Sequence, residues 1–129
     1  MINTEILLID DDVEDLEIFV SVFATIDDRI KCSVMRNPRL ALEKLTAHSL
    51  KPDLIFLDLN MPTMSGLQFL VQAGTMEELK KIPIVILTTS SNPLTILETR
   101  NLGAVDFITK PNTIPELKSL LENAVSMFA

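Results

Sequence analysis

Charged or hydroxyl side chains stand at the ends of four short apolar segments of this sequence. In chain order they are the pair Asp10 and Asp11, then Asp58, Thr88 and Lys110. If the apolar segments are parallel strands of one sheet, their carboxyl ends meet at one edge, where open α/β sheets bind ligands. The spacing therefore predicts that three carboxylates, one hydroxyl and one ammonium group share a single site.

This set of residue types favours metal-assisted phosphoryl transfer. Three crowded carboxylates repel one another, which raises their pKa values and costs stability unless a cation is present. Oxygen ligands that leave the coordination shell partly open suit Mg²⁺, which keeps water and completes its shell with phosphate oxygens. A lysine and a hydroxyl beside the metal bind an anion, and one carboxylate can form an aspartyl phosphate.

The strand before Asp58 is the clearest element. Residues 54–57 read Leu-Ile-Phe-Leu, a run typical of strands that are buried on both faces in parallel sheets. Comparable runs predict strands over residues 5–9, 83–87 and 104–108, and a weaker, partly alternating segment predicts an edge strand over residues 30–35. Apolar residues at helical spacing predict helices between them, starting near Asp12, Asn37, Ser65, Asn92 and Thr113, the first of them ending near Ala24.

This alternation of strands and helices predicts an α/β fold. Right-handed crossovers make the sheet parallel, so we expect a doubly wound five-stranded sheet with helices on both faces. The 129 residues fit one domain, which would span residues 1–129. The alternation by itself does not determine the order of the strands.

The composition excludes several classes of function. The net charge is −7, which argues against nucleic-acid binding because phosphate contacts need a basic patch. No long uncharged apolar run is present to span a membrane. The single Cys32 suits the reducing cytoplasm, and the single His48 rules out a multi-histidine metal site. With 3 Gly, the chain has neither a dinucleotide-binding fingerprint nor a P-loop.

Four segments resemble the receiver domain of response regulators in two-component signalling, in the family's order. They are ILLIDDD at 6–12, LDLNMPTMSG at 57–66, PIVILT at 83–88 and GAVDFITKP at 103–111. The resemblance covers essentially the whole chain and is to the stand-alone, single-domain type. It implies a flavodoxin-like fold with strand order 2-1-3-4-5.

The resemblance also implies roles for the residues at the carboxyl edge. Asp58 matches the phospho-acceptor, and Asp11, Asp58 and the backbone carbonyl of Asn60 match the Mg²⁺ ligands. Asp10 matches a residue that acts through a metal-bound water. Lys110 matches the lysine that pairs with the phosphoryl group, and with the acceptor before it is modified.

Further matches concern the switch. Thr88 stands where the family's hydroxyl contacts a phosphoryl oxygen, and Phe107 stands where an aromatic side chain turns inward as that residue moves. Asn60 and Ser90 occupy positions that tune the lifetime of the phosphoryl group.

Three backbone and size features complete the comparison with the family. The Lys110–Pro111 bond is expected to be cis, which would aim the lysine at the site. Phe107 replaces the Tyr of many members, so it carries no hydroxyl. Thr89 stands where a small Ala or Gly is usual, and its bulk could narrow access to the acceptor.

The function implied by the resemblance is a phosphorelay signalling switch. A histidine kinase or histidine phosphotransfer protein would supply the phosphoryl group, and the face of the fourth helix, fifth strand and last helix would change its affinity for a downstream protein. The chain would catalyse its own phosphorylation and dephosphorylation without being a turnover enzyme. Since no further domain follows Phe128 and Ala129, output is expected through a partner, from a monomer or a phosphorylation-dependent homodimer.

Two other functions remain open at this stage. A small phosphatase with an aspartate nucleophile would use Asp10 and Asp12, which have the required two-residue separation, although its usual late acidic pair is missing. A binding module of the same fold would no longer accept phosphate. Each residue alone also has a plainer explanation, with Asp58 as a turn residue and Lys110 as a surface lysine.

Overall fold

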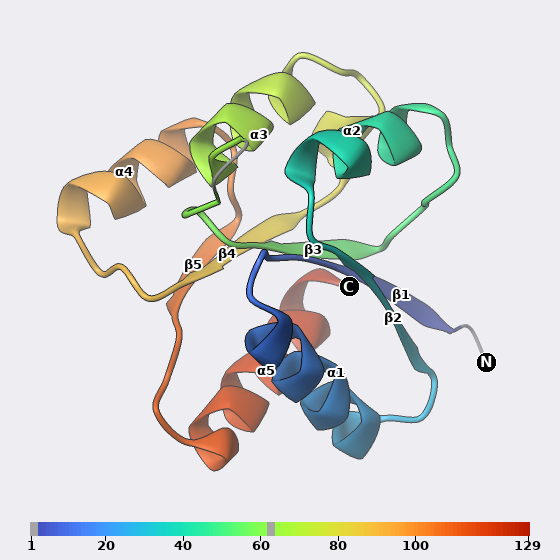
Figure 1. Ribbon diagram of the computed structural model, residues 1–129, viewed down its shortest axis with the longest axis vertical. Coiled ribbons are helices and arrows are strands. Elements are labelled where there is room, and N and C mark those ends of the chain that lie inside the picture. Colours follow the sequence, from blue (N-terminus) through green and yellow to red (C-terminus); the bar gives the residue numbers. More distant parts are fainter. Residues whose placement is uncertain (1–2, 62–63) are drawn as a thin grey trace.

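The chain folds into one parallel five-stranded sheet with helices on both faces (Figure 1). The computed structural model describes residues 3–61 and 64–129. The strands are β1 (Thr4–Ile9), β2 (Ile30–Met35), β3 (Leu54–Leu57), β4 (Ile84–Thr88) and β5 (Asp106–Thr109). Their spatial order is β2-β1-β3-β4-β5, which confirms the fold class and the strand order expected from the sequence.

In the described residues, four α-helices and one short 3₁₀ helix lie between successive strands, and a fifth α-helix follows the last strand. They are α1 (Val13–Ile26), α2 (Pro38–Thr46), α3 (Gly66–Gly74), η1 (Leu79–Lys81), α4 (Pro93–Asn101) and α5 (Ile114–Phe128). Figure 1 shows α1 and α5 on one face of the sheet and α2, α3 and α4 on the other. Within the described residues, no helix is both long and apolar enough to cross a bilayer.

The strands bury alternate side chains in two core layers. Leu7 and Ile55 belong to the layer beneath α2 and α3, whereas Leu8 and Phe56 belong to the layer beneath α1 and α5. Strand β3 is buried along its whole length, as expected for a central strand of a doubly wound sheet. Its position fixes the backbone that leads directly into Asp58.

The helix starts follow the capping residues that the sequence indicated. The Asp12 carboxylate accepts hydrogen bonds from the backbone N–H groups of Glu14 and Asp15 at the start of α1. Asn37 and Asn92 cap α2 and α4 in the same way, each with proline at the next position. Such caps set where each helix leaves the carboxyl edge of the sheet.

Two element boundaries differ from the sequence prediction by two residues. Helix α1 continues to Ile26 rather than ending near Ala24, because Ile26 packs against the core layer beneath α1 and α5. Strand β5 begins at Asp106 rather than at Ala104. The N–H of Ala104 donates to the carbonyl of Thr99, so this residue completes the end of α4 before the pairing with β4 begins.

Candidate functional site

Four strands deliver polar side chains to the same edge of the sheet. Asp10 follows β1, Asp58 follows β3, Thr88 ends β4, and Lys110 follows β5. Backbone hydrogen bonds between neighbouring strands extend to this edge, from Asp58 N to Ile9 O at 2.9 Å and from Lys110 N to Thr88 O at 2.7 Å. The side chains therefore start from backbone positions that the sheet holds in place.

Three carboxylates form a cluster at this edge. Asp10, Asp11 and Asp58 each offer an oxygen, and these oxygens all lie within 4.8 Å of one another. Asp10 is 3% exposed and Asp58 is 7% exposed, whereas Asp11 is more open to solvent. Hard oxygen donors that fill only part of a coordination shell fit Mg²⁺, so the residues present suit this ion.

Burial makes the two inner carboxylates expensive to ionise. It raises the pKa of both Asp10 and Asp58 above the ordinary aspartate value, and the Lys110 ammonium opposes this rise without cancelling it. The charge of Asp10 adds to the rise at Asp58. A bound cation would therefore lower the free energy of the ionised cluster at neutral pH.

The Lys110 ammonium lies inside the cluster and bonds to two carboxylates. Its Nζ is 2.7 Å from Asp10 Oδ2, 2.7 Å from Asp15 Oδ2 and 4.0 Å from Asp58 Oδ1. It also lies 5.7 Å from the centre of the Phe19 ring. Burial alone would lower the pKa of Lys110, but the bonds to Asp10 and Asp15 raise it overall, so the ammonium is firmly charged.

The structure gives Lys110 two closer partners than the expected one, Asp58. The hydrogen bonds go to Asp10 and Asp15, and Asp58 is at ion-pair distance only. Asp15 was not among the residues that the sequence singled out. Its only sequence signal is its place in the first turn of a helix that begins beside Asp10 and Asp11.

The Thr88 hydroxyl is a buried polar group without a partner. Thr88 is 0% exposed, and its Oγ1 makes no close hydrogen bond within the described residues, although it lies near enough to the Asp58 carboxyl to lower the pKa of that group. An unsatisfied buried hydroxyl costs about 1–3 kcal/mol, so it is seldom retained without a reason. An anion attached to Asp58 is the group that this hydroxyl could serve.

The turn after Asp58 is fitted closely against α3. A Cβ atom on Gly66 would lie 2.6 Å from the Asp58 carbonyl oxygen and 2.7 Å from the Leu59 Cα, so only glycine fits here. The Gly66 N–H donates to the Leu59 carbonyl at 2.9 Å, and the nearby Asn60 N–H partly offsets the raised pKa of the Asp58 carboxyl. Residues 62 and 63 of this segment lie outside the described residues.

The remaining predicted site residues lie on the neighbouring loop and strand. Phe107 is half-buried and packs against the core layer beneath α2 and α3. The Ser90 hydroxyl accepts a long hydrogen bond from the N–H of Asn92 at 3.5 Å, and Thr89 is exposed. Their roles in switching and in phosphoryl lifetime stay predictions.

One predicted backbone feature is wrong. No cis peptide bond occurs in the described residues, so the Lys110–Pro111 bond is trans. A trans bond before proline is favoured by about 0.5–1 kcal/mol. With this geometry the Lys110 side chain already reaches Asp10 and Asp15.

Asp12 is committed to a structural role. It is exposed, and its Oδ1 caps α1 by accepting from the N–H groups of Glu14 and Asp15 at 3.0 and 3.2 Å. The phosphatase hypothesis needs the Asp12 carboxylate beside the nucleophile, but this carboxylate caps α1 instead.

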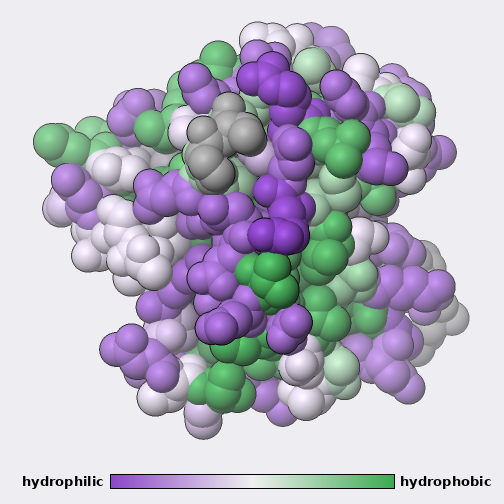
Figure 2. Space-filling model, in the orientation of Figure 1, coloured by the Kyte–Doolittle hydropathy of each residue, from purple (hydrophilic) through white to green (hydrophobic). Residues whose placement is uncertain are grey.

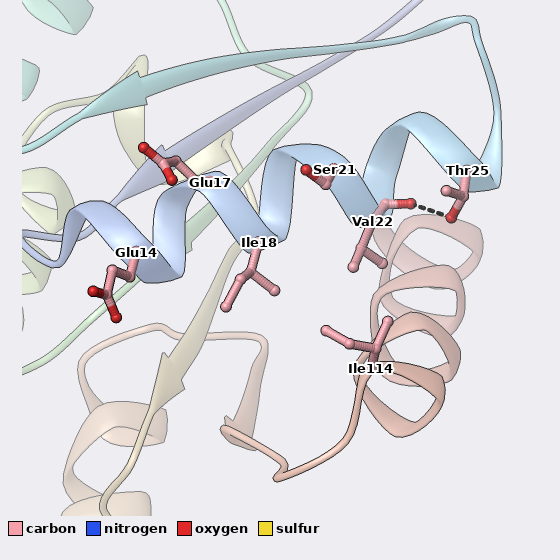
Figure 3. Close-up of a pocket in the computed structure, with 7 residues that line it drawn as sticks. All are labelled: Glu14, Glu17, Ile18, Ser21, Val22, Thr25 and Ile114. Carbon is pink, nitrogen blue, oxygen red and sulfur yellow. Dashed lines mark hydrogen bonds between the residues drawn. The ribbon is translucent and has the colours of Figure 1, made fainter.

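A separate apolar groove lies between α1 and the start of α5. It has a volume of about 500 Å³ and is lined by Glu14, Glu17, Ile18, Ser21, Val22, Thr25 and Ile114. Figure 3 shows Ile18 and Ile114 facing one another across it, and Figure 2 shows apolar surface gathered over this half of the molecule. None of the clustered carboxylates lines this groove. The residues suited to phosphoryl transfer therefore lie at the carboxyl edge of the sheet and not in the groove.

The geometry defines an α/β domain with an acidic site at the carboxyl edge of its sheet, and comparison with known proteins gives it a family. Residues 6–122 match the response regulator receiver domain family, so the chain belongs to that family. Receiver domains act in two-component signalling, where they interact with histidine kinases or phosphotransfer proteins and bind Mg²⁺ or Mn²⁺ at an acidic pocket.

Two response regulators resemble the chain over nearly their full length. The phosphorylated cyanobacterial phytochrome response regulator RcpA superposes with a TM-score of 0.89 at 27% identity, covering 98% of this chain and 94% of RcpA. Response regulator Rcp1 of Synechocystis sp. is 28% identical over 95% of this chain and 87% of its own length. The Mn²⁺-bound structure of Rcp1 superposes with a TM-score of 0.83, at 29% identity and with 96% and 93% coverage.

Other relatives are considerably longer proteins. A probable cyclic di-GMP phosphodiesterase of Vibrio cholerae is 38% identical over 88% of this chain, which corresponds to 25% of that protein. A protein-glutamate methylesterase/protein-glutamine glutaminase of Geobacter metallireducens is 35% identical over 83% of this chain and 29% of its own length. The chain thus spans about a quarter of the length of these relatives.

Proposed function

We propose that this chain is a phosphorylation-dependent switch in which Asp58 accepts a phosphoryl group from a phosphohistidine donor. The observation that carries the proposal is the meeting of three clustered carboxylates, a charged lysine and a partnerless buried hydroxyl at one sheet edge. The bond from phosphorus to the Asp58 oxygen forms as the bond from phosphorus to the donor imidazole breaks. Asp58 is buried, with 7% of its surface still exposed.

The other clustered residues would hold Mg²⁺. Asp11, Asp58 and the Asn60 carbonyl would be its protein ligands, and Asp10 would act through a bound water. When bound, the ion supplies positive charge that offsets the carboxylates and the incoming phosphoryl oxygens. The raised pKa values of Asp10 and Asp58 support such a role, since these carboxylates lack sufficient counter-charge by themselves.

Two groups would bind the phosphoryl oxygens directly. Lys110 lies 4.0 Å from Asp58 and stays charged, so its ammonium can reach an oxygen attached to that residue. The Thr88 hydroxyl, which has no close hydrogen-bond partner within the described residues, can donate to a second phosphoryl oxygen. Asn60, two residues after Asp58, and Ser90, two residues after Thr88, would tune the lifetime of the phosphoryl group.

The response would spread from Thr88 to the face formed by α4, β5 and α5. As Thr88 moves toward the anion, the half-buried Phe107 would turn inward and shift the balance between two conformations of this face. Helix α4 is suited to such a change because Leu94 and Leu97 are 75% and 56% exposed and Thr99 is its one buried residue among those described. We infer that a downstream protein, still unidentified, reads this face in the cytoplasm.

The proposal is tested by covalent labelling. The protein is incubated with acetyl phosphate and Mg²⁺, and we expect an intact-mass gain of one phosphoryl group per chain that disappears when the metal is chelated. Hydroxylamine should remove the label, because acyl phosphates react with it, and peptide mapping should place the label on Asp58. Metal-independent labelling, or labelling of another residue, would contradict the proposal.

The same experiment separates the competing functions. Repeated release of phosphate from a phosphate ester, with no labelled chain at any time, would indicate a phosphatase. Absence of both labelling and beryllofluoride-induced changes in the NMR signals of Thr88 and Phe107 would indicate a binding module that does not accept phosphate.

Replacing Thr88 with valine is expected to separate stability from phosphoryl binding. The variant should be as stable as the wild type or more stable, by up to about 1 kcal/mol, since it loses an unsatisfied buried hydroxyl. Its affinity for beryllofluoride with Mg²⁺ should fall about tenfold, because valine cannot donate to the anion. Urea unfolding and NMR titration measure the two quantities.

Thr99→Val is the matched control for this prediction. Thr99 is equally buried, but its hydroxyl donates to the Ile96 carbonyl at 2.8 Å, away from the site. This variant should lose about 1 kcal/mol of stability and keep its affinity for the anion. If Thr88→Val retains full affinity, the assigned contact is wrong.

A further inference from the structure

We propose that Asp15 is a positioning residue that competes with the phosphoryl group for Lys110 and thereby weakens the phosphorylated state. This inference deepens the function proposed above and depends on it. It starts from the hydrogen bond of 2.7 Å between Lys110 Nζ and Asp15 Oδ2, which duplicates the bond of the same length to Asp10 Oδ2.

Lys110 offers three N–H donors, and two of them are taken. Asp10 and Asp15 accept from Nζ, while Asp58 Oδ1 lies at 4.0 Å, too far for a hydrogen bond. The Phe19 ring lies 5.7 Å from Nζ and adds a further attractive contact. The ammonium is therefore held on the α1 side of the site, next to the acceptor rather than bonded to it.

Asp15 is placed for this contact by the way α1 begins. Its backbone N–H donates to the Asp12 carboxylate, which fixes the first turn of the helix. Its side chain extends from the first turn of α1 to the Lys110 ammonium at the edge of the sheet. With 30% of its side chain exposed, Asp15 can turn to solvent at low cost when another anion claims Lys110.

Asp15 is not part of the metal cluster. The clustered oxygens belong to Asp10, Asp11 and Asp58, whereas the Asp15 carboxylate bonds to the lysine and acts on the cluster only through its charge, which adds to the raised pKa of Asp10. A phosphoryl group on Asp58 needs the same ammonium, and like charge between it and the Asp15 carboxylate is unfavourable. Asp15 thus favours the unmodified state by holding Lys110, although it is neither the acceptor nor a metal ligand.

The test measures the affinity of the full chain for beryllofluoride at saturating Mg²⁺, by NMR titration. Asp15→Asn is expected to bind about fivefold tighter than the wild type, as for the loss of one partly exposed competing charge. Its affinity for Mg²⁺ alone should stay within about twofold of the wild type, because Asp15 lies outside the cluster. A residue with only a structural role would not tighten anion binding when it is replaced.

Two further variants control for charge and position. Glu14→Gln removes an equal charge from the same helical turn, and among the described residues no hydrogen bond or ion pair joins Glu14 to Lys110. The affinity of this variant for beryllofluoride should therefore change less than about twofold. Asp15→Glu keeps the charge and should behave as the wild type. The inference is overturned if Asp15→Asn binds no tighter than Glu14→Gln, or if Asp15→Glu gains as much as Asp15→Asn. If the wild type does not bind beryllofluoride with Mg²⁺, the proposed function fails as well.

Discussion

Asp58→Asn is expected to abolish phosphoryl uptake from acetyl phosphate. The asparagine amide is no nucleophile at phosphorus, and none of the neighbouring carboxylates is equivalent to Asp58. Asp10 bonds to Lys110 and to the N–H of Asp12, and Asp11 lies at the more open side of the cluster. Intact-mass analysis after incubation with Mg²⁺ and the phosphodonor should therefore detect only the unmodified chain.

The same variant should be more stable than the wild type at neutral pH without metal. Burial raises the pKa of Asp58 in the folded state above its value in the unfolded chain. A group with a raised folded pKa contributes stability below its unfolded pKa and loses that contribution as the pH rises through the folded pKa. The advantage of asparagine should thus grow as the pH rises from about 4, and it should shrink when Mg²⁺ is added.

Asp53→Asn is the matched control for Asp58→Asn. Asp53 precedes β3 at the opposite edge of the sheet, where its carboxylate accepts from the Glu5 N–H at 2.8 Å. This variant should still gain one phosphoryl group. Stoichiometric labelling of Asp58→Asn would show that another residue is the acceptor.

Lys110→Met is expected to destabilise the folded protein strongly at neutral pH. The substitution keeps much of the side-chain volume but leaves the buried Asp10 carboxylate without its cation, and Asp58 without its nearest positive charge. Removing one partner of a buried ion pair typically costs about 3–5 kcal/mol. The loss should shrink as the pH falls and protonates these carboxylates, whose folded pKa values are raised.

Urea unfolding with and without Mg²⁺ measures this effect. The metal should restore part of the lost stability, because it supplies positive charge to the same cluster. Lys44→Met, on the exposed side of α2, should stay within about 0.5 kcal/mol of the wild type. A Lys110→Met protein as stable as Lys44→Met would mean that the ammonium does not stabilise the cluster.

The sequence by itself was enough to predict the sheet and the residues at its carboxyl edge. The strands β1 and β3 are short apolar runs, and chain connectivity carries the residues that follow them, Asp10 and Asp58, to the edge. The helix starts at Asn37 and Asn92 could be predicted for a similar reason, since capping depends on a few adjacent residues. Strand order came only from resemblance to the receiver family, and the structure confirms it.

The hydrogen-bond partners of Lys110 and Thr88 were decided by the tertiary structure. A lysine side chain can turn toward any nearby carboxylate, so the choice of Asp10 and Asp15 over Asp58 depends on how α1 approaches the edge of the sheet. The partnerless Thr88 hydroxyl likewise results from what surrounds β4, which no local pattern encodes. Residue types and strand ends determined which groups meet at the site. Helix packing decided which of them bond to one another, because such contacts join segments far apart in the chain.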